Sequence, residues 1–447
     1  MYKIKYISLI LLINLTAAFL LGGCKTSDDT FPTFTINPSV DDLSGSSSID
    51  EETDDTSSVE SVPHIVVSLP YSDTTISYLG KLFYLKQSDN LGSNTTGASI
   101  NLEYLEGVNA PFIIDSLLSS PTGSNLNTIK NWSDNGGVPD LFLTNDLKGV
   151  YENGYICPLD QYVFDNDLLS SVNTFDSVYS CKIGDALFGI PYGFSYDLIF
   201  ANIDYLPRDF IENYDITSKS YVNVFSDVST LNGFIIDNFQ GGNDIISESE
   251  TNQLVIFRGA YQLLLNDYST ETYDFVKSWY DNDFASEYDT NNSDPVVSRS
   301  AVMWIGNSSE MDFWSDYYPE KLCFFRLPSV NGNYYPYATL YPMCVSSESQ
   351  FKSFASDFAS FIAFDEDALL LINRLENNNG IYPMADYYSV WNNITSDSDF
   401  GNIARSIQQL TGDIVFSNNV IDNASYKDLL LEVRESVVIE EEENEQE

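Results

Sequence analysis

From His64 onward the chain alternates short β-rich runs with helical stripes, and this order limits the possible folds more than any other feature. The run HIVVSLP ends in a loop, and Thr75–Gln87 follows with apolar residues at helical spacing. We predict a strand at Ser99–Leu105, a helical segment at Phe112–Leu118 and a buried strand at about 139–144. This β-α-β-α-β order predicts an α/β domain with a largely parallel sheet.

The later part of the chain continues with mixed signals. Residues 187–207 read as two strand-like runs, and helix patterns cover Tyr221–Asn238 and Leu254–Asp267. An amphipathic helix is predicted at Gln350–Phe364, and a second helix at Asp367–Glu376 precedes Asn-Gly, a helix-ending signal.

Composition excludes several classes of function. The 447 residues include 66 Asp or Glu against 20 Lys or Arg, a formal net charge of -46. A body this acidic is repelled by phosphate backbones, so nucleic-acid binding is excluded. The sequence has one histidine and no GxSxG, HExxH, CxxC, GxGxxG or P-loop motif. We therefore expect no metal, no cofactor and no enzyme activity.

The N-terminus reads as an export signal. Two lysines precede an apolar run of Ile7–Leu21, which is too short for a comfortable membrane span, and Gly22-Gly23-Cys24 follows. Leu21–Cys24 resembles the bacterial lipobox, in which the cysteine is acylated. Residues 1–23 are thus predicted to be a signal peptide and Cys24 the lipid attachment site; the alternative is an ordinary signal peptide with a chance cysteine. Such a protein would be lipid-anchored to a bacterial membrane, with its folded body in the periplasm or outside the cell.

Two acidic segments flank the body. Residues 24–62 are rich in Ser, Thr, Asp and Glu without periodicity, which predicts a flexible tether that holds the body away from the lipid. Residues 437–447 form an acidic tail.

Four cysteines remain after Cys24, and an exported chain can form disulfides. A hairpin centred near Asn333 and Tyr334 would set Cys323 opposite Cys344, and Cys157–Cys181 then follows by elimination. The alternative is that all four are small buried hydrophobic residues.

Several segments together resemble the extracellular solute-binding proteins (family 1 type) of ABC importers, a family that includes many sugar binders. The resemblance covers about residues 64–435 and consists of five segments in the family's order: PDLFLTNDLKGVYENGYICPLDQYV, LFGIPYGFSYDLIFANIDYLP, SRSAVMWIGNSSEM, FRLPSVNG and SFASDFASFIAFDEDALLLINR. The sequence departs from the family pattern at Arg299 and Ile203, and 208–299 matches poorly.

The resemblance implies an α/β, two-lobed, periplasmic-binding-protein-like (type II) fold with an interlobe cleft. Lobe one would comprise 64–196 plus 303–340, and lobe two 197–302 plus 341–436. The hinge crossings would lie near Tyr196–Leu198, Met303–Trp304 and Leu340–Tyr341. The protein would be a monomer that closes around a small solute and delivers it to ABC permease subunits. A sugar or an oligosaccharide is the leading candidate for this solute.

Sugar binding requires aromatic rings for the C–H faces and carboxylates or amides for the hydroxyls. The candidate ligand-binding residues are loop and strand-end residues: Tyr71, Asp73, Asn145, Asp146, Tyr192, Tyr196, Trp304, Asn307 and Tyr337. Trp304 is the main candidate for stacking on the solute, and core packing is its alternative role. Two other functions stay open: a surface lipoprotein glycoside hydrolase with paired carboxylates, and an adhesin or interaction lipoprotein without transport.

Overall fold

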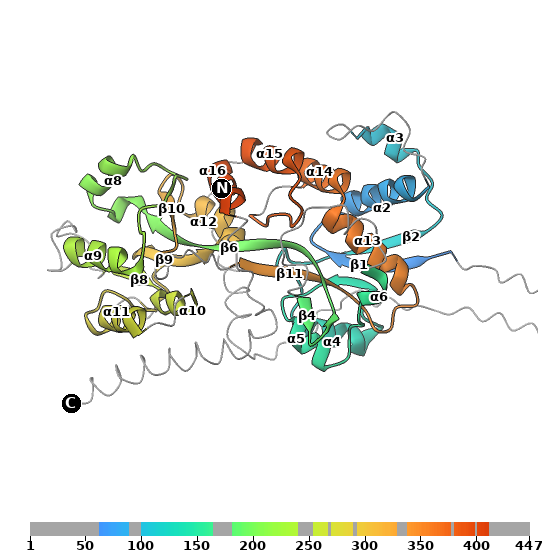
Figure 1. The fold of residues 1–447 in the computed structure, drawn as a ribbon, viewed down its shortest axis with the longest axis horizontal. Helices are drawn as coiled ribbons and strands as arrows, with labels where there is room; N and C mark the ends of the chain where they lie inside the picture. Colours follow the sequence, from blue (N-terminus) through green and yellow to red (C-terminus); the bar gives the residue numbers. More distant parts are fainter. Residues whose placement is uncertain are drawn as a thin grey trace, which may run out of the picture.

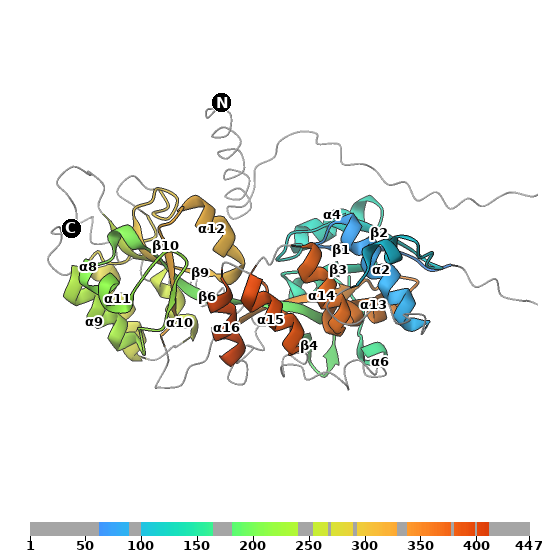
Figure 2. The same cartoon turned by 90° about the horizontal axis from the view of Figure 1, so that it is seen from above.

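The computed structural model describes residues 62–88, 100–163, 181–239, 254–266, 270–288, 293–328, 338–376, 380–397 and 400–410. Within these residues two α/β lobes lie side by side and share one strand (Figures 1 and 2). None of the described helices is both long enough and apolar enough to cross a membrane.

The lobe-one sheet has the strand order β2-β1-β3-β11-β6. Its strands are β2 (Ile113–Leu118), β1 (His64–Leu69), β3 (Leu141–Leu143), β11 (Ala338–Val345) and the first half of β6 (Ile190–Asn202). The first three are parallel, whereas β11 runs antiparallel to both β3 and β6, so this sheet is mixed and not largely parallel as the alternating pattern predicted.

The second half of β6 belongs to the sheet of lobe two. Tyr196 pairs with Ala338 of β11, while Asp197, the next residue, pairs with Asn307 of β9 (Ala301–Asn307). The sheet of lobe two contains β8 (Val255–Arg258), β9, β6, β10 (Leu322–Arg326) and β7 (Tyr221–Val222). The chain therefore crosses between lobes within β6, and this crossing agrees with the hinge expected at Tyr196–Leu198.

Helices cover each sheet. In lobe one α2 (Asp73–Gln87) packs against α13 (Lys352–Phe364) and α14 (Glu366–Leu375), and the ring of Phe83 contacts Phe354, Phe358 and Phe361. The remaining helices of lobe one are α3 (Leu102–Glu106), α4 (Leu126–Asn135), α5 (Leu147–Glu152) and α6 (Asp160–Val163), and a small hairpin joins β4 (Lys182–Ile183) to β5 (Ala186–Leu187).

In lobe two one face of the sheet packs on a separate hydrophobic core. Its helices are α8 (Arg208–Tyr214), α9 (Val228–Phe239), α10 (Leu263–Asn266), α11 (Thr270–Asp281) and α12 (Met311–Tyr317). The two last described helices, α15 (Tyr388–Asp397) and α16 (Gly401–Leu410), lie between the lobes in both views (Figures 1 and 2). The opposite face of the lobe-two sheet joins the core of lobe one through residues such as Phe324, whose ring contacts Phe400.

The expected lobe boundaries were wrong from Met303 onward. Strands β9 and β10 pair with the second half of β6, so 303–326 belongs to lobe two. β11, α13 and α14 pack in lobe one, so 341–376 belongs there. The reason is topological: after β10 the chain returns to lobe one, and β11 inserts between β3 and β6. The hinge expected at Met303–Trp304 is also wrong, because β9 stays within lobe two.

Two local predictions were interchanged. Within the expected strand Ser99–Leu105 the structure forms α3, capped by the Asn101 side chain, which accepts from the backbone N–H groups of Glu103 and Tyr104. The expected helical segment Phe112–Leu118 is instead strand β2, paired in parallel along the whole length of β1. Three further predictions differ from the structure. Residues 187–207, expected to form two strand-like runs, contain one long strand, β6. The helix expected from Tyr221 begins only at Val228, and the helix expected from Leu254 is preceded by strand β8.

Candidate functional site

The first group of predicted site residues lies where β1 ends and α2 begins. Ser72 caps α2, and both its backbone N–H and its hydroxyl donate to Glu376 Oε1 at 3.0 Å. Asp73 accepts a hydrogen bond from Ser116 of β2 and borders a surface hollow of about 340 Å³ on α2. Glu376, which follows α14, was not predicted; it ties the end of α14 to the N-terminus of α2.

The two predicted site residues that follow β3, Asn145 and Asp146, differ in their contacts. Asp146 caps α5, because its Oδ1 accepts from the Gly149 backbone N–H at 2.9 Å. Asn145 is exposed, and its backbone N–H donates to the Ser124 carbonyl at 3.3 Å. Asp146 thus has a local folding role, whereas the Asn145 side chain is open to solvent.

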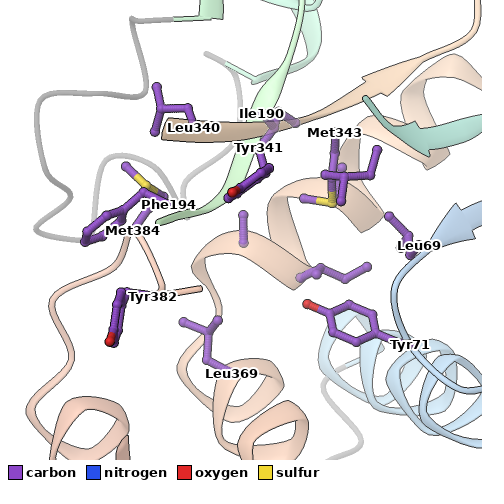
Figure 3. Close-up of a cluster of buried hydrophobic side chains, with 14 of the residues drawn as sticks. Leu69, Tyr71, Ile190, Phe194, Leu340, Tyr341, Met343, Leu369, Tyr382 and Met384 are labelled. Atoms are coloured by element: carbon purple, nitrogen blue, oxygen red, sulfur yellow. The ribbon is translucent and has the colours of Figure 1, made fainter. Parts of the chain in front are cut away.

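Three tyrosines from three elements come together beside the hinge. Tyr71 and Tyr192 lie edge to face with ring centroids 5.9 Å apart. The Tyr341 hydroxyl lies 2.7 Å from the Ser195 hydroxyl. Figure 3 shows Tyr71 and Tyr341 at the same hydrophobic cluster, which Leu69 and Met343 also line. Burial raises the pKa of Tyr71, Tyr192 and Tyr341, so these phenols stay protonated at neutral pH and can donate hydrogen bonds.

A carboxylate lies at the residue where β6 changes lobes. Asp197 is the only charged residue of β6, and its Oδ1 accepts from Asn307 Nδ2 at 2.9 Å. Burial, which outweighs the hydrogen bond from Asn307, raises the pKa of Asp197 to about 7, and the negative charge of Glu310 adds to the rise. The Asn307 amide is held in turn, because its Oδ1 accepts from the Ser309 backbone N–H and hydroxyl. Sequence analysis identified Asn307 but missed Asp197; the signal available was an acid inside the apolar run FSYDLIF.

Tyr196 and Trp304 are buried in the core. Tyr196 is 0% exposed and Trp304 2% exposed. The Trp304 ring is stacked on Phe200 at 5.6 Å and contacts Tyr318 at 5.4 Å. This packing favours the core role for Trp304 over stacking on a solute, because neighbouring rings cover it.

Trp304 belongs to a row of aromatic residues across the lobe-two sheet. The register places Trp304 of β9, Phe200 of β6, Phe324 of β10 and Tyr221 of β7 side by side. Tyr196 lies on the same face of β6 as Phe200. Among the described residues, three polar atoms at this row are buried without a hydrogen-bond partner: Trp304 Nε1, the Tyr221 hydroxyl and the Tyr196 hydroxyl. A water or a solute hydroxyl at these atoms would remove the cost of leaving them unpaired.

Two predicted positions, Cys24 and Tyr337, lie outside the described residues. The described part of the chain contains no group of three or more His, Cys, Asp or Glu placed to hold a metal ion.

The four body cysteines carry free thiols in the structure. The predicted pairing of Cys323 with Cys344 is wrong, because strand β6 lies between β10 and β11. Cys323 pairs with Ala201 in lobe two, whereas Cys344 pairs with Phe142 in lobe one. The pairing of Cys157 with Cys181 was inferred only by elimination, so it has no support once Cys323–Cys344 is wrong.

No family model and no curated protein matches this sequence. Solved structures do match in fold. An ABC substrate-binding protein from Listeria monocytogenes in complex with cycloalternan is 13% identical, with a TM-score of 0.55 over 84% of this chain and 93% of that one. The cyclic alpha-maltosyl-1,6-maltose binding protein from Arthrobacter globiformis is 11% identical, with a TM-score of 0.51 over 84% and 98%.

A third neighbour binds a solute of another kind. UgpB from Mycobacterium tuberculosis in complex with glycerophosphocholine is 10% identical, with a TM-score of 0.51 over 84% and 98%. The chain therefore has the two-lobed fold of ABC solute-binding proteins, as the resemblance implied.

Proposed function

We propose that this protein is the solute-binding component of an ABC importer and that it captures a neutral sugar or oligosaccharide between its lobes. The observation that carries the proposal is the shared strand: β6 pairs with β11 in lobe one up to Tyr196 and with β9 in lobe two from Asp197. A change in backbone angles over these residues moves one lobe against the other, and a solute that contacts both lobes stabilises the closed arrangement.

The groups beside the crossing match the surface of a sugar. The phenol of Tyr192, against which the buried Tyr71 packs, can contact hydroxyls, and the half-buried ring of Tyr192 offers an apolar face. The Asp197 carboxylate and the exposed Asn145 amide supply hydrogen-bonding groups from the hinge and from lobe one. These groups come from loops and strands that are far apart in the chain order.

The charge around the crossing argues against an anionic solute. Asp197 forms no ion pair among the described residues, and Glu310 adds a second negative charge beside it. Burial raises the pKa of Glu310 and the positive charge of Arg258 lowers it, but this guanidinium is already paired with Asp294 at 3.0 Å. A sugar phosphate would meet uncompensated acids here, so the favoured solute is uncharged.

A binding screen with a matched variant tests the proposal. Isothermal calorimetry against neutral oligosaccharides and their phosphorylated counterparts should find binding in the neutral set alone. Tyr192→Ala should weaken that binding about ten-fold or more, by analogy with lost stacking on other flat ligands. Tyr214→Ala, an exposed tyrosine on α8 of lobe two, should leave it unchanged. Hydrolysis of the oligosaccharide, or tight binding of the phosphorylated set alone, would contradict the proposal.

A further inference from the structure

Three of the four body cysteines lie close together in lobe one, at the end of the sheet away from the hinge. Cys344 is in β11, Cys157 donates its backbone N–H to Val345 of the same strand at 3.1 Å, and Cys181 accepts at its carbonyl from the Phe188 N–H at 3.1 Å. All three are buried, with exposed fractions of 0% for Cys181 and Cys344 and 8% for Cys157.

Gly189 lies between Cys344 and Cys181. A Cβ atom built on Gly189 would lie 3.5 Å from Cys344 Sγ and 3.6 Å from the Cβ of Cys181. It would also come within 2.7 Å of the Pro342 Cβ, so only glycine fits between these neighbours. Gly189 directly precedes Ile190, which pairs with Met343, the residue before Cys344. The missing side chain thus leaves the space in which Cys181 approaches Cys344.

Cys157 reaches β11 from a different side. The bridge between Ile156 and Ser346 sets Cys157 opposite Val345 rather than opposite Cys344. Because successive side chains of a strand point to opposite faces, Cys157 shares the face of Val345 and not that of Cys344. Cys181 is therefore better placed than Cys157 to pair with Cys344.

From this geometry we infer that Cys181 and Cys344 form a disulfide when the chain folds in an oxidising compartment. The bond joins the start of the β4–β5 hairpin to the central strand β11. The two thiols together lose two electrons and two protons to an external disulfide, such as oxidised glutathione, which leaves as two thiols. Cys157 and Cys323 stay reduced. The inference depends on export of the chain and is independent of which solute it binds.

The thiols react before the core closes. Burial raises the pKa of Cys181 to about 12 and that of Cys344 well above its usual value, so the folded protein holds almost no thiolate at these positions. Oxidation therefore belongs to folding, and the finished bond is protected from reductants.

Peptide mapping of the full-length protein tests the inference. The chain is refolded in a mixture of reduced and oxidised glutathione, unfolded without reductant and alkylated, with the Cys24 peptide counted separately. We expect one crosslinked peptide pair that contains Cys181 and Cys344, together with alkylated Cys157 and Cys323. A crosslink that contains Cys157, or four alkylated body cysteines, overturns the inference.

Variants and a stability measurement give an independent check. Cys157→Ser should retain the crosslink and Cys344→Ser should abolish it. Reductant present during refolding should lower the midpoint of thermal unfolding of the parent protein by about 5 °C or more, since the bond closes a long loop. The same treatment should leave Cys181→Ser unchanged; an equal drop in that variant contradicts the bond.

Discussion

The Asn307 amide donates a hydrogen bond of 2.9 Å to the Asp197 carboxylate across adjacent strands, at the residue pair where β6 passes from one lobe to the other. This contact joins the hinge strand to the η5 turn (Ser308–Glu310), which Asn307 caps. It holds an acid at one of the two positions of β6 that are not fully buried, the other being Tyr192.

Asp197 should make stability depend on pH. Its pKa is raised to about 7 in the folded protein, above its ordinary value of 3.8. A carboxyl with a raised folded pKa favours the folded state when protonated, so its contribution is fully present below about pH 4 and is lost as the pH rises toward 7. Asp197→Asn should therefore melt several degrees above the parent at pH 8 and at the same temperature or lower at pH 4. A constant difference across that range would show that Asp197 does not titrate there.

Trp304 should act on stability and not on affinity. Loss of its buried ring in Trp304→Ala removes contacts with Phe200 and Tyr318 and should cost about 3–5 kcal/mol of unfolding free energy. The protein that still folds should bind its solute with unchanged affinity in calorimetry. A ten- to hundred-fold loss of affinity would restore the stacking role.

Lys86 should be a strong stabilising residue of lobe one. Its ammonium group lies 2.6 Å from the buried carboxylate of Asp365 and 2.7 Å from Asp367. Lys86→Met leaves Asp365 buried and unpaired, so chemical denaturation should show a loss of about 3 kcal/mol, at the low end for buried pairs. Arg208→Met breaks the exposed pair with Glu212 and serves as the control, with a loss of less than about 0.5 kcal/mol.

Cys24 should attach the protein to a membrane. Acylation of this cysteine provides the anchoring energy of its buried methylenes. Cys24→Ser should move the protein from the detergent phase to the aqueous phase in Triton X-114 partition, whereas Ser44→Ala in the tether should not. If Cys24→Ser stays in the detergent phase, the anchor lies elsewhere.

Solute binding should close the two lobes. Small-angle scattering of the parent protein at saturating solute should give a smaller radius of gyration than without solute, because β6 bends at Tyr196–Asp197. Tyr192→Ala at the same solute concentration should keep the larger radius. An unchanged radius in the saturated parent would exclude closure.

The sequence by itself determined the local elements with strong periodicity and the fold class. Apolar residues at helical spacing specified α2, and the β-rich runs specified β1 and β3, because burial of one face requires that spacing. The order of motifs specified the two-lobed fold.

The tertiary structure decided everything that depends on pairing between distant segments. Short apolar runs fit a helix or a strand equally well, so 99–105 and 112–118 were resolved only when Ile113–Leu118 paired with β1. The candidate site also depends on long-range contacts. Strand β6 connects the lobes because β11 and β9 pair with its two halves. Trp304 is a core residue because Phe200 and Tyr318 cover its ring. Long-range pairing is not encoded in local spacing, since each strand finds its neighbour through the burial that the whole fold makes possible.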